Sequence, residues 1–155
     1  LRFFTVYGPW GRPDMALFLF TNSILKGQKI QLFNNGNMVR DFTYVDDIVE
    51  SLILLLEKVP SQDPDFDYLR PNPATSNCPY RIFNIGNSKP RNLNEYIDAL
   101  ENSLQIKANK EFLPMQLGDV PETAADTSYL EEWIGFKPNT DISVGIEKFV
   151  EICKS

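Results

Sequence analysis

Histidine is absent from this sequence of 155 residues. This absence excludes Ser-His-Asp triads, Cys-His nucleophiles and zinc sites that use imidazole. Any acid-base chemistry would have to use Tyr, Lys, Asp, Glu, Arg or a cofactor. General disorder is also excluded, because hydrophobic residues make up 43% and charged residues 23% of the chain, the balance of a globular protein.

Cysteine is scarce. The two cysteines, Cys78 and Cys153, are far apart in the sequence and form no C-x-x-C pair. The sequence therefore indicates neither a redox motif nor a disulfide framework. We expect the protein to reside in the reducing cytoplasm.

An excess of positive charge and long apolar runs are missing too. Lys and Arg number 15 against 21 for Asp and Glu, which gives a formal charge of −6 and predicts no binding to nucleic acid or anionic membranes. The longest apolar runs, residues 16–20 and 52–56, are too short to span a bilayer, and the first residues show no signal-peptide pattern. Because there is no initiator Met, we expect the chain to be part of a longer protein.

Neither a phosphate-binding loop nor a metal loop can be found. The eight glycines are spaced so that no G-x-G-x-x-G or Walker loop forms, and none of the six tyrosines has Lys four residues later. Asp63, Asp65 and Asp67 alternate as in a calcium loop, but Tyr68 and Ala74 stand where that loop needs Gly and Glu. We therefore expect no metal site.

The remaining pattern alternates short strands with amphipathic helices, which is typical of a single α/β domain. Residues 60–79 hold five of the 11 prolines and are predicted to form a long surface loop. NNGN at 34–37 predicts a turn, and Asn92 is the predicted cap of a helix. The predicted strands are 1–6, with a buried character, 30–33, 38–45 and 80–86; the predicted helices are 15–25, 46–58, 92–104, 128–134 and 142–152.

Several charged residues stand at the ends of these elements. Asp46 and Asp47 could form a carboxylate pair for acid-base work, but their position favours helix capping. Arg12 and Arg40 lie near strand ends, where α/β proteins place ligand contacts, and each could bind a carboxylate or phosphate or form a surface salt bridge. Asp119 could accept a hydrogen bond from a sugar hydroxyl or cap a turn.

Five segments, taken in order, resemble one family. They are RFFTVYGPWGRPDMA, KIQLFNNGNMVRDFTYVDDIV, FNIGNSKPRNL, MQLGDVPETAAD and IGFKPNTDISVGIEKFV. The series resembles the C-terminal part of the NAD-dependent nucleotide-sugar epimerases and dehydratases, which are extended short-chain dehydrogenases. The resemblance implies that residues 1–155 are the nucleotide-sugar-binding region of a Rossmann-type fold, with residues 1–8 as the last strand of its Rossmann-type half.

The first of these segments is most similar to UDP-glucuronate 4-epimerases. In that subfamily the residues that correspond to Thr5 and Arg12 would hold the carboxylate of the sugar. Charge-assisted pairing with a planar anion is what a guanidinium does well. The resemblance therefore implies that the substrate is UDP-glucuronate or UDP-galacturonate.

The same resemblance implies where the nucleotide binds. The segment from Gln31 to Phe33 would meet the uracil through backbone contacts and packing. Arg40 would bind the diphosphate and Asp119 the uridine ribose.

The resemblance also implies what this chain does not contain. NAD and the catalytic Tyr and Lys would belong to the N-terminal half, so we expect no catalytic or cofactor-binding residue here and no activity of this chain alone. In the family the Tyr removes the 4-hydroxyl proton as hydride leaves C4, and the 4-keto sugar then turns over. Family dimers form through helices of the missing half, which implies a homodimeric parent.

Two other interpretations remain open at this point. The parent could be a UDP-galactose 4-epimerase or another sugar-nucleotide dehydratase or decarboxylase. Alternatively, the chain could be a non-catalytic module that binds UDP-sugars.

Overall fold

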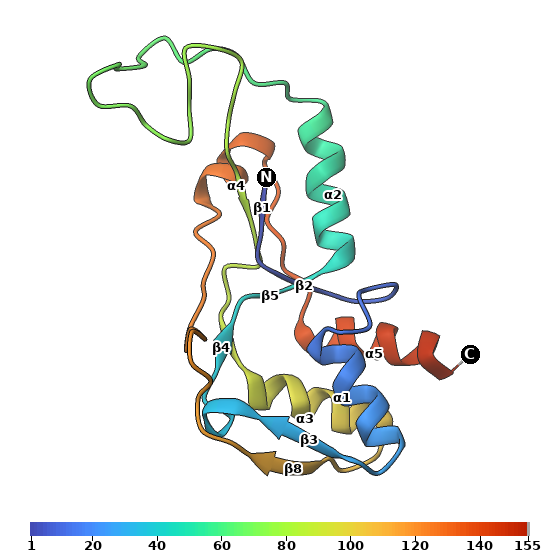
Figure 1. The fold of residues 1–155 in the computed structure, drawn as a ribbon. Coiled ribbons are helices and arrows are strands. Elements are labelled where there is room, and N and C mark those ends of the chain that lie inside the picture. The colour runs from blue at the N-terminus through green and yellow to red at the C-terminus, as the bar shows by residue number, and fades with distance from the viewer. Residues whose placement is uncertain (155) are drawn as a thin grey trace.

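A computed structural model describes residues 1–154 and has the α/β architecture that the sequence predicts (Figure 1). Every predicted helix is confirmed, with ends within two residues of the prediction. No helix in the described part of the chain is long and apolar enough to cross a lipid bilayer. The helices are α1 (Ala16–Leu25), η1 (Phe33–Gly36, a 3-10 helix), α2 (Val45–Leu56), α3 (Leu93–Leu104), α4 (Ser128–Ile134) and α5 (Ile142–Lys154).

The strands are short and pair two by two. β1 pairs with β6, β2 with β5 and β3 with β8, all parallel, whereas β4 and β7 are antiparallel. The strands are β1 (Arg2–Phe3), β2 (Thr5–Tyr7), β3 (Lys29–Leu32), β4 (Val39–Arg40), β5 (Phe42–Tyr44), β6 (Asn84–Ile85), β7 (Arg91–Asn92) and β8 (Asn109–Phe112).

The prediction of one buried strand over residues 1–6 is wrong. The segment is divided at Phe4 into β1 and β2, and the side chain of Phe3 is 51% exposed. Among the described residues β1 is bordered by β6 alone, so its other backbone edge has no partner strand. An apolar pattern in a sequence reports which side chains can be buried, not whether a neighbour is present to bury them.

Two apolar clusters stabilise opposite ends of the molecule. One lies where α1, α3 and α5 pack around β3 and β5, and it contains the stacked rings of Phe42 and Tyr96, 4.4 Å apart. The other joins α2 to α4 through Ile48, Phe83 and Leu130. Figure 1 shows that β2 and β5 cross between these two ends.

Asn92 caps α3, as its sequence predicts. Its side chain accepts a hydrogen bond from the backbone N–H of Asn94 at 2.9 Å, and the Glu95 carboxylate accepts one from the N–H of Asn92, which completes a capping box. The NNGN turn is confirmed as well, because Asn34 and Asn35 adopt left-handed φ angles of 51° and 52° that Asn tolerates better than most residues.

The predicted capping role of Asp46 and Asp47 is wrong. Helix α2 begins at Val45 and has no side-chain cap, so both carboxylates lie inside its first turn. Asp47 is buried and accepts hydrogen bonds from the N–H groups of Asn139 (3.1 Å) and Thr140 (2.9 Å) and from the Thr140 hydroxyl (2.8 Å). Its role is to attach the segment before α5 to the start of α2.

Residues 60–79 extend away from the rest of the molecule (Figure 1). They form no helix, and their one strand-like contact is a bridge between Thr75 and Arg81. Hydrogen bonds within the segment hold its two arms together, including Asp63 N–H to the Ser76 carbonyl at 2.8 Å. The segment is remote from the cavities described below.

Glu101 is a buried carboxylate at the junction of α3 and β8. It accepts hydrogen bonds from Lys107 Nζ (2.6 Å), Lys110 Nζ (3.0 Å) and the N–H of Ala108 (3.2 Å). Burial by itself raises the pKa of Glu101, but these bonds outweigh it and lower the pKa to about 2. The ionised carboxylate thus fixes the connection between α3 and β8.

We predict that Asp47→Ala lowers the free energy of unfolding by about 2 to 4 kcal/mol, because three part-buried donors lose their buried acceptor. The neighbouring and exposed Asp46 provides the matched control, since Asp46→Ala should change stability by less than about 0.5 kcal/mol. Chemical denaturation of both variants is the measurement. Equal losses would mean that both residues act only on the helix terminus.

We also predict an acid-sensitive component of stability at Glu101. Because its pKa is lower in the folded chain than the ordinary 4.5, the stabilisation is complete above pH 4.5 and is lost as the pH falls towards 2. It amounts to at most about 3 kcal/mol. Glu101→Gln should flatten the dependence of unfolding free energy on pH in this window, whereas exposed Glu57→Gln should leave it unchanged.

Candidate functional site

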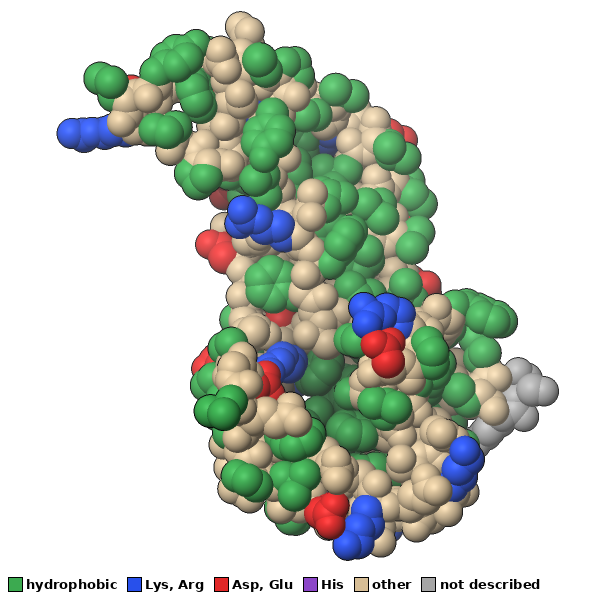
Figure 2. Space-filling model, viewed as in Figure 1, with side chains coloured by type: hydrophobic (Ala, Val, Ile, Leu, Met, Phe, Trp, Pro, Cys, Tyr) green, Lys and Arg blue, Asp and Glu red, His purple; other side chains and the backbone are tan. Residues whose placement is uncertain are grey.

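The central feature is a cavity of about 300 Å³ between β2, α1, β3 and the segment around Asp119. Five residues that the sequence suggested line it together: Thr5, Gln31, Phe33, Arg40 and Asp119. They come from positions 5 to 119, and only the fold brings them together. Figure 2 shows this hollow in the lower half of the molecule, with an apolar floor and with basic and acidic side chains at its borders.

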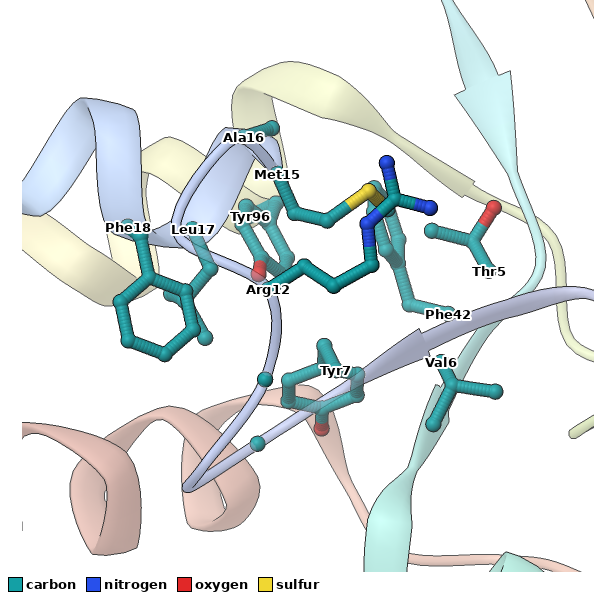
Figure 3. Close-up of a pocket in the computed structure, with 12 residues that line it drawn as sticks. Thr5, Val6, Tyr7, Arg12, Met15, Ala16, Leu17, Phe18, Phe42 and Tyr96 are labelled. Carbon is teal, nitrogen blue, oxygen red and sulfur yellow. The ribbon is translucent and has the colours of Figure 1, made fainter.

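Arg12 lines a smaller adjoining cavity of about 40 Å³. The two cavities share Thr5, Met15, Ala16 and Phe42. Figure 3 shows the Arg12 side chain extended along the small cavity, which Thr5 also lines. The sixth suggested residue thus borders the same hollow.

Arg12 is paired with Asp14. Its Nε donates to Asp14 Oδ1 at 3.1 Å and its Nη2 to Oδ2 at 2.5 Å, while both side chains are largely exposed. This hydrogen bonding raises the pKa of Arg12 and lowers the pKa of the Asp14 carboxyl. Both groups are charged at neutral pH, and the guanidinium can hold a second anion.

Arg40 and Asp119 form an ion pair at the other border of the cavity. Arg40 Nη2 lies 3.2 Å from Asp119 Oδ1, and Nη1 donates to the carbonyls of Val39 (2.9 Å) and Pro121 (3.3 Å). The Arg40 side chain is only 20% exposed, so it is held in one orientation. A guanidinium and a carboxylate side by side can bind a phosphate and a hydroxyl at once.

Asp41, next to Arg40, was missed by the sequence reasoning. It is fully buried, and its carboxylate accepts hydrogen bonds from the N–H groups of Asn87 (3.0 Å), Ser88 (3.0 Å) and Ala125 (3.1 Å). Gly86 lies so close that a Cβ there would stand 2.8 Å from the carboxylate. A charged residue amid the strand pattern of MVRDFTYV was the available signal, because a buried carboxylate must find several donors.

Gln31 is placed on β3 so that its backbone faces away from β8. Leu113 N–H donates to the Leu32 carbonyl at 3.0 Å, and Leu32 is opposite Phe112 in the register. Because peptide groups alternate sides along a strand, the N–H and C=O of Gln31 point to the other edge. In the described chain β3 has no partner on that edge. The Gln31 side chain reaches Glu111 Oε2 at 3.4 Å.

The apolar floor of the cavity was also missed. Residues of α1, the residue before β4 and the start of α3 contribute to it. From periodicity alone, these residues are predicted to belong to the hydrophobic core. Their signal was only a set of methionine and aromatic residues near Gly-rich turns. They are Met15, Ala16, Phe20, Met38, Phe42 and Leu93.

A metal site or a catalytic base within the described residues would need suitable side chains there. Residues 1–154 contain no group of three or more Cys, Asp or Glu side chains arranged to hold a metal. Tyr7 borders the small cavity, but its hydroxyl packs against Gly145 of α5, and burial raises its pKa well above the usual value. The sequence contains no glycine-rich phosphate loop.

Comparison with known proteins identifies relatives for the whole chain. CapI of Staphylococcus aureus is 52% identical over 151 residues, which cover 97% of this chain and 45% of CapI. A probable UDP-glucuronate 4-epimerase of Rhizobium meliloti is 44% identical over 154 residues, which cover 97% of this chain and 44% of that protein. The chain thus spans about half the length of the curated relatives it matches.

The fold agrees with solved structures. UDP-glucuronic acid 4-epimerase of Bacillus cereus, in complex with UDP-glucuronic acid and NAD, has a TM-score of 0.80 and 29% identity, covering 99% of this chain and 44% of that one. The family model described as "NAD dependent epimerase/dehydratase family" matches residues 1–86, which include Arg12, Gln31 and Arg40. The chain therefore belongs to the NAD dependent epimerase/dehydratase family.

Proposed function

We propose that this chain binds UDP-glucuronate and UDP-galacturonate as the substrate-binding part of an NAD-dependent UDP-glucuronate 4-epimerase. The observation that carries the proposal is a pair of adjoining cavities with a shared apolar lining, one lined by Arg12 and the other by Arg40. A UDP-hexuronate has two anionic groups, its diphosphate and its sugar carboxylate, that such a hollow can bind. The two relatives above with UDP-glucuronate in their names support the choice of sugar.

The free edge of β3 suits a uracil base. The Gln31 carbonyl is an acceptor, and the N–H of Phe33, two residues later, is a donor on the same side of the chain. Uracil offers the complement, an N3–H donor next to a carbonyl acceptor. The Phe33 ring, which lines the cavity with Phe20, supplies apolar packing for the base.

Arg40 and Asp119 suit the middle of the ligand. Arg40 would hold the diphosphate with charge-assisted hydrogen bonds, and Asp119 would accept from the ribose hydroxyls. The ion pair between them keeps both groups oriented before the ligand arrives. Binding therefore needs little reordering of these two side chains.

Arg12 and Thr5 suit the sugar carboxylate. The guanidinium provides two parallel N–H donors and the threonine hydroxyl a third donor beside it (Figure 3). A neutral hexose would leave these donors without a charged partner. This end of the hollow would therefore select an acidic sugar over a neutral one.

Hydride and proton transfer are assigned to the remainder of the parent enzyme. Tyr7, Tyr44 and Tyr96 all have a raised pKa because of burial, so none suits the role of a base at neutral pH. The chain alone would bind substrate without epimerising it. The parent would be a homodimer in the cytoplasm. In that reducing compartment the exposed thiols of Cys78 and Cys153 would stay reduced.

We predict that Arg12 and Arg40 contribute differently to the affinities for UDP-glucuronate and for UDP. Arg12→Ala should weaken UDP-glucuronate binding about 10-fold or more and leave UDP binding unchanged, because only the sugar carboxylate is affected. Arg40→Ala should weaken both ligands to a similar extent. Isothermal titration calorimetry is the measurement, with Arg70→Ala on the remote loop as the control; equal effects of Arg12→Ala on both ligands would contradict the assignment.

We also predict that the chain prefers UDP to CDP. Cytosine has an acceptor at N3 and a donor at its 4-amino group, which reverses the pattern that Gln31 and Phe33 can match. The preference should reach about 10-fold or more, the cost of unpaired polar groups. Competition titrations of the two diphosphates provide the measurement, and equal affinities would remove β3 as the base-binding edge.

A further inference from the structure

The ion pair between Arg12 and Asp14 is the starting point. Both side chains are mostly exposed, at 75% and 63%, and a pair of this kind contributes little to folding stability. Yet its geometry is well defined, with two hydrogen bonds between one edge of the guanidinium and both carboxylate oxygens. A bidentate pair fixes the plane and direction of a guanidinium.

The backbone that carries the pair is itself constrained. Met15 N–H donates to the Arg12 carbonyl at 3.1 Å, which closes a turn with Pro13 at its second position. Proline there fixes φ near the value that such a turn requires. Gly11, just before the turn, packs against Phe18 so closely that a Cβ would stand 3.0 Å from the ring. The backbone at Arg12 and Asp14 is therefore fixed, and so are the points from which the two side chains extend.

The guanidinium has a second edge. Asp14 takes Nε and Nη2, and in the described chain no hydrogen bond from Nη1 is made to another residue. An edge formed by Nη1 and the second hydrogen of Nη2 can hold another carboxylate in the same bidentate way. Figure 3 shows this terminal part of Arg12 on the Thr5 side of the cavity.

We propose that Asp14 is a positioning residue that directs the free edge of Arg12 at the carboxylate of the bound sugar. The inference rests on the proposed function and deepens it, since it names what makes Arg12 selective. Asp14 also offsets the positive charge of Arg12. The pair then recognises a carboxylate by the geometry of two donors beside Thr5, and it attracts a misplaced diphosphate less than a lone arginine would.

The test is the ratio of affinities for UDP-glucuronate and UDP-glucose, measured by calorimetry on the 155-residue chain. Asp14→Ala should reduce this ratio about fivefold or more, because Arg12 loses its fixed direction, and should leave the affinity for UDP unchanged. Asp14→Asn keeps one acceptor oxygen and should recover part of the ratio. Asp98→Ala, which removes a surface partner of Lys110 at 3.5 Å, is the matched control and should have no effect.

Each result bears on the inference. An unchanged ratio in Asp14→Ala would overturn it, and an increased preference for UDP-glucuronate would overturn it by making Asp14 a competitor of the substrate. A loss of UDP binding in a variant with an unchanged circular dichroism spectrum would assign Asp14 a general role in the site instead. If the unaltered chain binds neither UDP nor its sugars, the proposed function itself fails, and this inference fails with it.

Discussion

The buried carboxylate of Asp41 is the contact on which the site depends. It accepts backbone hydrogen bonds from residues 87, 88 and 125, so it joins three segments that are far apart in the chain. Arg40 precedes it, and the segment that ends at Ala125 carries Asp119. Since a carboxylate away from water must keep its hydrogen-bond donors, these three segments are held in one arrangement. The ion pair of Arg40 and Asp119 is a consequence of it.

Local sequence signals predicted the helices well, whereas the predicted strands 1–6 and 38–45 are each divided in two and the predicted strand 80–86 is reduced to Asn84–Ile85. Each helix follows from apolar periodicity and its terminal residues, and Asn92 with Glu95 forms the capping box that such a spacing suggests. Asp47 shows the limit of this reasoning. An aspartate at a helix start looks the same in sequence whether it caps its own helix or binds the N–H groups of Asn139 and Thr140, because the deciding partner is 92 residues away.

Only part of the candidate site could be predicted from the sequence. Arg12, Arg40 and Asp119 are conspicuous as charged residues beside turns, but no local pattern links Arg40 to a residue 79 positions later. Ordered motifs that resemble a known family made that link. Asp41 and the apolar floor remained hidden, since a buried acid and a methionine on a helix have no sequence signature that separates scaffold from site. Their roles follow only from the packing.

Under the proposed function, the arrangement would let this chain carry the specificity of a longer enzyme. On that proposal, strand β3 would present a backbone edge to the base, Arg40 a cation to the diphosphate and Arg12 a cation to the carboxylate. Each is held by contacts within this chain: β8 for the strand, Asp119 for Arg40 and Asp14 for Arg12. Preorganised groups of this kind lower the cost of ordering on binding.

The most direct test of this account is a calorimetric titration of the unaltered 155-residue chain with UDP-glucuronate, UDP-glucose and UDP. The account predicts that all three bind and that UDP-glucuronate binds most tightly, because Arg12 and Thr5 act only on the carboxylated sugar. A folded chain that binds none of the three, or that binds UDP-glucose as tightly as UDP-glucuronate, would contradict the claim that this chain contains the determinants of substrate choice.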